Sequence, residues 1–200
     1  KAGSFQKAVE TLQQFLDEYD DHPEVPRALM EAYDAAKSTG NVEDALDFVS
    51  RIVNNFPESE FYAKALYQRV HLRFLHGYND AALEDSRTFL EKFARLPLAA
   101  DVLMWTADYF ANQGEREKAE EQYLRIVSLH PELPAAQVAL YEAARSAYKR
   151  GALERARRLL GQLEQDYSQV PRTRIHAHAQ ILHGDILAQQ GQYQAAIDHF

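Results

Sequence analysis

The chain has 200 residues, 46% of them hydrophobic, and a net charge of −8 at pH 7, a composition that predicts a folded protein rather than a disordered one. It contains no cysteine, which excludes disulfides and thiolate metal sites. Nucleic-acid binding favours a basic domain, so for this acidic chain we expect no nucleic-acid partner. No apolar run approaches the roughly 20 residues that span a bilayer, so we expect no direct membrane insertion.

The charge is unevenly distributed along the chain. Residues 1–60 hold 13 acidic and 5 basic residues, whereas residues 61–200 hold 17 of each kind. Within the second part, residues 141–175 hold 8 basic and 4 acidic residues. We interpret this distribution as a solvated surface with an acidic end and a mildly basic stretch.

A glycine recurs every 37 residues, with one last step of 40, and an alanine follows each glycine after five residues. A fixed period of this length predicts one supersecondary unit repeated along the chain. The chain is therefore expected to be a solenoid, in which each unit packs only on its neighbours. The glycines are Gly3, Gly40, Gly77, Gly114, Gly151 and Gly191, and the alanines are Ala8, Ala45, Ala82, Ala119, Ala156 and Ala196.

Each repeat is predicted to contain two helices. Helix A precedes the glycine and carries a leucine column, namely Leu29, Leu66, Leu103 and Leu140. Helix B follows the glycine. Its evidence is an apolar face formed by three positions, which are the alanine, a large apolar residue seven positions later and a ring eleven positions later. We predict eleven helices: a leading B helix over 4–19, then A/B pairs over 26–56, 62–93, 99–130, 136–167 and 173–200.

The residue types at the helix ends and crossings have physical reasons. Glycine ends helix A because it adopts a positive φ at low cost, and alanine allows helices A and B to approach closely. A proline column (Pro23, Pro97, Pro134 and Pro171) separates each B helix from the next A helix. Pro171 to Gly191 is three residues longer than the equivalent step before it, which predicts a longer helix or a loop around "RTRIHAHAQ" and a changed twist there.

These columns resemble the tetratricopeptide repeat (TPR) family, whose pattern is W-x2-L-G-x2-Y, then G, then A-x3-F, then P. The later half of the pattern is well matched in "GSFQKAVETL" (3–12), "GNVEDALDFV" (40–49) and "GQYQAAIDHF" (191–200). The tryptophan position is leucine in four units and Gln180 in the last. The resemblance implies an all-α, TPR-like α-solenoid of antiparallel helix pairs stacked into a right-handed superhelix, over residues 1–200.

The 37-residue period narrows the resemblance. Segments such as "NNFPESEFYAKALYQ" (54–68) are similar to the variant common in bacterial cell-envelope proteins, including outer-membrane assembly lipoproteins. That similarity implies a bacterial protein of the periplasm or cell envelope, with the cytoplasm as the alternative.

In TPR proteins helix A lines most of the concave groove, so the resemblance implies a binding surface for a peptide or helical segment of another protein. Aromatic, arginine and methionine side chains suit such a surface. The alternative for Tyr67 and Phe74 is packing between adjacent units, and the convex face is the alternative surface. The candidate partner-binding residues are Arg27, Met30, Asp34, Tyr67, His71, Phe74, Met104, Asp108, Asn112, Tyr141, Arg145, Tyr148 and Lys149, followed on the fifth A helix by His178, Ile181, Asp185 and Gln189.

Known catalytic and ligand-binding motifs are missing from the sequence. It has no phosphate-binding loop, nucleophile elbow or zinc-protease helix, so we expect no enzyme, no catalytic residue and no cofactor. His176 and His183 lie seven residues apart and would need ligands from another helix to hold a metal, so no metal site is expected. The Lys and Asn residues with which some family members grip a carboxylate are missing, although Arg145 and Lys149 lie one turn apart and would suit a single acidic group if they are not simply solvated.

Two functions fit this sequence. The first is a protein–protein interaction module within a larger scaffold protein. The alternative is a structural spacer or assembly platform in a longer TPR solenoid with no dedicated groove ligand. The chain begins and ends inside repeats, so we expect a fragment of a longer protein. The spacer hypothesis predicts that its uncapped ends self-associate.

Overall fold

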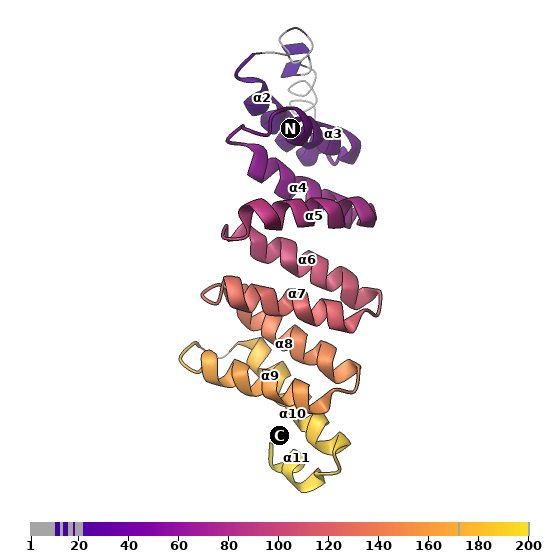
Figure 1. Cartoon of the computed structure of the whole chain (residues 1–200), viewed down its shortest axis with the longest axis vertical. Coiled ribbons are helices and arrows are strands. Elements are labelled where there is room, and N and C mark those ends of the chain that lie inside the picture. The colour runs from indigo at the N-terminus through magenta and orange to yellow at the C-terminus, as the bar shows by residue number, and fades with distance from the viewer. Residues whose placement is uncertain (1–10, 13, 16–17, 19–21, 172, 200) are drawn as a thin grey trace. The chain divides into compact units, whose positions relative to one another are not determined.

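The computed structural model describes residues 11–12, 14–15, 18, 22–171 and 173–199. The leading helix predicted over 4–19 lies mostly outside these residues. The described part of the chain contains ten α-helices with defined bounds and no strand. Figure 1 labels these helices α2 to α11. The helices are α2 (Val25–Thr39), α3 (Val42–Asn55), α4 (Tyr62–Leu75), α5 (Asn79–Phe93), α6 (Leu98–Asn112), α7 (Arg116–Leu129), α8 (Pro134–Lys149), α9 (Leu153–Asp166), α10 (Arg174–Gln189) and α11 (Tyr193–His199).

The predicted helix pairs are confirmed, and the turn between α2 and α3 shows how one A helix ends and one B helix begins. Gly40 has φ 75°, and its N–H donates to the carbonyl oxygens of Ala36 and Lys37 at the end of α2. The Asn41 side chain then accepts a hydrogen bond from the Asp44 N–H, at 3.3 Å, and caps the start of α3. The glycines at the other four A/B turns have the same left-handed conformation.

The predicted apolar columns form the core. All four leucines of the A column are fully buried, as are Ile52, Phe89, Ile126 and Leu163 of the B column. The alanines from Ala45 to Ala156 are at most 1% exposed, and Ala196 is 5% exposed. Small residues are thus found where helices A and B cross, as expected from close packing.

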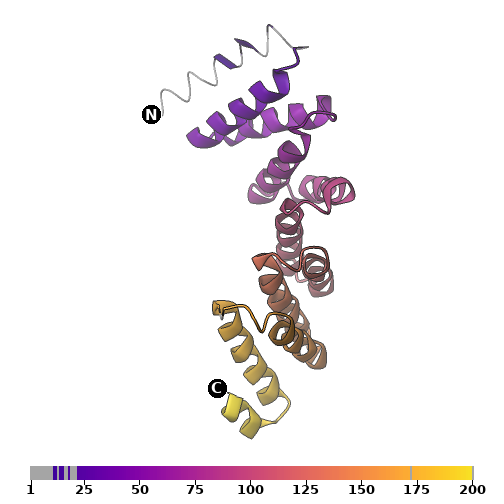
Figure 2. The same cartoon turned by 90° about the vertical axis from the view of Figure 1, so that its left-hand side faces the viewer.

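The chain divides into two compact units, residues 1–93 and residues 94–200. In unit 1 the hairpins α2–α3 and α4–α5 stack through contacts between α3 and α4. In unit 2, α8 contacts both α6 and α7, and α10 contacts both α8 and α9 (Figure 2). Each unit is therefore a stack of antiparallel helix pairs, while a single solenoid over 1–200 stays a prediction.

The three additional residues of the last repeat are found in a loop, which was one of the two predicted outcomes. Residues 167–173 connect α9 to α10, whereas residues 130–133 connect α7 to α8. Helices α8 and α10 each have 16 residues, so the helix itself is not longer. The Thr173 N–H donates to the His176 Nδ1, at 3.1 Å, at the start of α10.

Candidate partner-binding site

In unit 1, two of the predicted binding residues of α2 are exposed and the third is not. Arg27 and Asp34 are exposed, and Arg27 forms an ion pair with Glu24 at 3.1 Å. Met30 departs from the prediction, because only 3% of it is exposed and it packs in the core with Leu29. Its apolar side chain is covered by neighbouring residues and is not available to a partner.

The predicted residues of α4 are half-buried. The ring of Tyr67 lies 6.3 Å from the buried ring of Phe89, so Tyr67 packs on the core and is still partly exposed. His71 and Phe74 are also partly exposed. Beside them, the Tyr33 hydroxyl donates to Gln68 Oε1 at 2.6 Å and joins α2 to α4.

In unit 2, the predicted binding residues occupy neighbouring A helices that touch one another. Met104, Tyr141, Arg145 and Tyr148 are half-buried, whereas Asp108, Asn112 and Lys149 are exposed. The ring of Tyr141 lies 5.9 Å from that of His178 and connects α8 to α10. We call this surface the A-helix face of unit 2, and it consists of Met104, Asp108, Asn112, Tyr141, Glu142, Arg145, Tyr148, Lys149, His178, Ile181 and Asp185.

The sequence analysis missed two polar residues that hold predicted residues of this face in place, Tyr123 and Glu142. Tyr123 of α7 is 1% exposed, and its hydroxyl donates to Asp108 Oδ1 at 2.5 Å. Burial raises the pKa of Tyr123, and the hydrogen bond to Asp108 adds to this shift, so the hydroxyl stays neutral. Glu142 forms an ion pair with Arg145 at 2.6 Å, which holds the guanidinium in place.

Only 16% of the Glu142 side chain is exposed, and this burial raises the pKa of its carboxyl, a shift that Arg145 partly opposes. A carboxyl whose pKa is raised in the folded state stabilises the fold at low pH, and this contribution is lost as the pH rises through the folded pKa. We therefore expect that Glu142→Gln gains stability relative to the unsubstituted protein as the pH rises from below 4.5 to 7.

Urea unfolding of both proteins at several pH values measures this difference. Glu121→Gln, on the exposed part of α7, controls for the loss of one negative charge. A stability difference for Glu142→Gln that is the same at pH 4 and pH 7 would contradict the expectation.

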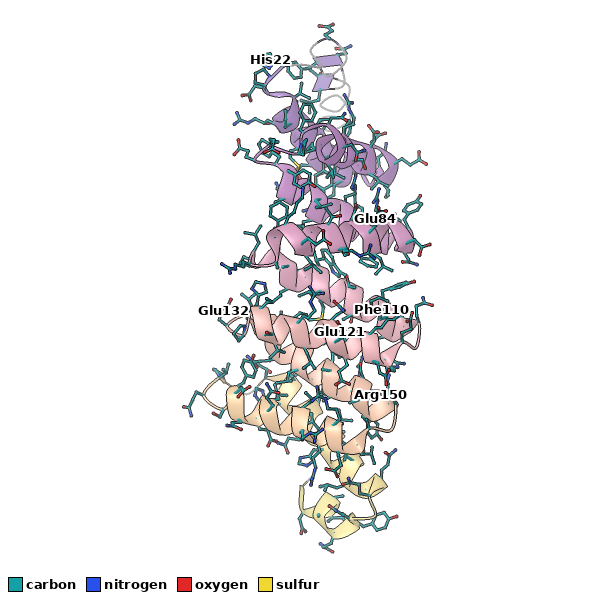
Figure 3. The ribbon with its side chains drawn as sticks, in the orientation of Figure 1. His22, Glu84, Phe110, Glu121, Glu132 and Arg150 are labelled. Carbon is teal, nitrogen blue, oxygen red and sulfur yellow. The ribbon has the colours of Figure 1, made fainter. Side chains whose placement is uncertain are left out.

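Buried charges elsewhere have structural partners. In unit 1, Asp85 accepts from Arg69 at 2.8 and 2.7 Å and from Arg73 at 2.7 Å. In unit 2, Glu120 is held by Arg150 at 2.7 Å and by Arg155 at 2.8 Å. Arg150 lies at the A/B turn end of unit 2, on the same side as Phe110 and opposite Glu132, as Figure 3 shows. These ion pairs join α4 to α5 around Asp85, and join α7 to α9 and to the turn after α8 around Glu120.

The opposite side of unit 2 offers an open hollow between the B helices α7 and α9. It measures about 540 Å³ and is lined by apolar and polar residues alike, namely Leu124, Val127, Ser128, Pro131, Gln162, Asp166 and Tyr167. Tyr167 is fixed there, since its hydroxyl donates to the Pro131 carbonyl oxygen at 3.1 Å. The hollow lacks the paired charges and aromatic contacts of the A-helix face.

In the described part of the chain, no group of three or more His, Asp or Glu side chains is placed to hold a metal ion. No described helix combines the length and the apolar character needed to cross a membrane.

Comparison with known proteins agrees with the repeat architecture. The model of the tetratricopeptide repeat family matches residues 1–60, 67–134 and 141–200. The chain belongs to the tetratricopeptide repeat family, a non-catalytic fold that generally serves as a protein–protein interaction module. Among curated proteins, none matches the sequence.

Several solved structures share the fold. BtubC from P. vanneervenii is 15% identical, with 100% of this chain and 86% of that chain covered and a TM-score of 0.69. A tetratricopeptide repeat protein from Parabacteroides merdae is 17% identical, with 98% and 71% covered and a TM-score of 0.66. MamA is 18% identical, with 84% and 91% covered and a TM-score of 0.65. At these identities the likeness shows the fold alone.

Proposed function

We propose that this protein is an interaction module and that the A-helix face of unit 2 binds a peptide or helical segment of a partner protein. The observation that carries the proposal is a pair of half-buried tyrosines, Tyr141 and Tyr148, beside the Arg145–Glu142 ion pair on one helix. Tyrosine and arginine side chains that are partly buried dominate the binding free energy of many protein interfaces.

The side chains of this face are held in place by the fold. Tyr141 contacts His178, Arg145 is bonded to Glu142, and Asp108 accepts a hydrogen bond from Tyr123. Side chains that are already ordered lose little conformational entropy on binding, so more of the contact energy appears as affinity. The A helices of unit 1, through Arg27, Asp34, Tyr67, His71 and Phe74, provide a second surface of the same kind.

We expect the double substitution Tyr141→Ala and Tyr148→Ala to weaken partner binding by at least tenfold, because both aromatic anchors are removed. The measurement is recovery of proteins from a lysate of the source cells, identified by mass spectrometry, with wild-type and variant protein as bait. Tyr78→Ala is the matched control, since Tyr78 is 55% exposed at the α4–α5 turn and lies off the A helices.

The outcomes separate the proposed function from its alternative. A protein recovered by the wild type and by Tyr78→Ala but not by the double variant supports the proposal. Recovery of the same proteins by all three contradicts it. Recovery of this chain alone favours the spacer or assembly platform. An apolar contact surface for such self-association is available on α11, where Tyr193 and Ile197 are each 68% exposed.

A further inference from the structure

The charges on the A-helix face of unit 2 differ in whether they are already neutralised. The Arg145 guanidinium is engaged by Glu142, so that pair contributes no net charge. Asp108 accepts from the Tyr123 hydroxyl, a neutral donor that leaves the negative charge in place. Asp185 is exposed, and no ion pair joins Asp108 or Asp185 to a cation in the described part of the chain.

The two aspartates occupy equivalent positions on either side of α8. Asp108, Arg145 and Asp185 each lie four residues after the corresponding residues Met104, Tyr141 and Ile181. Lys149 is exposed, but it lies one turn further along α8, level with Asn112 and Gln189. A segment that crosses α6, α8 and α10 therefore meets a negative charge, a neutral ion pair and a second negative charge.

One helical turn before the row of Asp108, Arg145 and Asp185, the surface is apolar and aromatic. Tyr141 is half-buried against His178, and Ile181 is 51% exposed on α10. An apolar side chain of a partner would pack on Tyr141 and Ile181 and remove their surfaces from water.

We propose that the A-helix face of unit 2 selects a partner segment with two basic side chains, one opposite Asp108 and one opposite Asp185, on either side of an apolar residue that packs on Tyr141. The inference rests on the proposed function and adds the chemistry of the partner. Charge complementarity of this kind sets specificity and register at protein interfaces.

The spacing of the two basic residues follows from helix packing. Helix α8 contacts both α6 and α10, and packed helices lie about 8–10 Å apart, so the two aspartates are about 20 Å apart across the face. An extended chain advances about 3.3 Å per residue, which sets the two basic residues about six positions apart.

Selection from a phage library of random twelve-residue peptides tests this proposal. Wild-type protein is expected to enrich peptides with two Lys or Arg residues five to seven positions apart and an apolar residue between them. The double variant Asp108→Asn, Asp185→Asn is expected to bind the enriched peptides about tenfold more weakly at low salt, since two exposed charge pairs are lost. Glu121→Gln with Glu132→Gln removes two exposed charges from other parts of unit 2 (Figure 3) and is expected to bind like the wild type.

The affinities are measured by fluorescence anisotropy with a synthetic copy of an enriched peptide, and circular dichroism confirms that each variant is folded. Enriched peptides without the basic pair, or equal affinity for the aspartate variant, overturn the inference. If those same peptides lose affinity for Tyr141→Ala, Tyr148→Ala, the proposed function still holds. Enrichment of no peptide, or of peptides that the tyrosine variant binds unchanged, contradicts both proposals.

Discussion

Replacement of Asp85 by alanine is expected to lower the free energy of unfolding by about 3–5 kcal/mol, because it leaves buried positive charge without a partner. Arg69 is 7% exposed, and both of its bonds to a carboxylate end at Asp85. Arg69 keeps only the amide oxygen of Asn54, at 3.0 Å, which does not offset a charge. Arg73 is more exposed and can turn its guanidinium to solvent. Urea unfolding followed by circular dichroism measures the loss.

The repeat itself provides the control for this prediction. The positions of Arg69 and Asp85 are occupied by Ala143 and Leu159 in the fourth A/B pair, where both residues are buried and apolar. The double variant Arg69→Ala, Asp85→Leu therefore removes both charges and is expected to recover most of the lost stability. A loss below about 1 kcal/mol for Asp85→Ala alone would show that water reaches the Arg69 guanidinium.

Replacement of Phe89 by alanine is expected to cost about 3–5 kcal/mol, because Phe89 is fully buried and its loss opens a cavity in unit 1. Its ring lies 5.4 Å from that of Phe93 and 6.3 Å from that of Tyr67. The substitution therefore also removes the support of Tyr67, a proposed binding residue of α4. The measurement is again the free energy of unfolding in urea.

The matched control for Phe89→Ala is Arg87→Ala, an exposed position on the same helix, which is expected to change stability by less than about 0.5 kcal/mol. Phe89→Leu keeps most of the apolar volume and is expected to lie between the two. If Phe89→Ala unfolds at the same urea concentration as Arg87→Ala, the B column does not form the core of unit 1.

These expectations bear on how function is to be tested in a repeat protein. Tyr67 contacts the core, so its replacement by alanine would weaken both packing and binding. The tyrosines of α8 give a cleaner test, because Tyr141 packs on the exposed His178 rather than on a buried ring. Asp108 and Asp185 are cleaner still, since both are exposed and their replacement by asparagine keeps size and shape.

The sequence did not predict correctly which side chains are exposed, because exposure depends on the residues of other helices that cover them. The register places Met30 on the same helix position as Tyr67 and Tyr141, but the first residue is buried and the other two are partly open. The same register could not indicate that Tyr123, on a B helix, reaches Asp108 on an A helix. The pattern also left a loop and a longer helix as alternatives in the last repeat.

The sequence by itself determined the helix pairs, their boundaries and the family, because these depend on local properties that recur with a period. A glycine at Gly40 ends a helix through its own φ, and an alanine at Ala45 permits close packing through its own size. Only the tertiary structure decided which charges are neutralised and which remain open. Contacts such as Arg69–Asp85, Tyr123–Asp108 and Tyr141–His178 join residues of different helices, and their distances depend on how those helices pack.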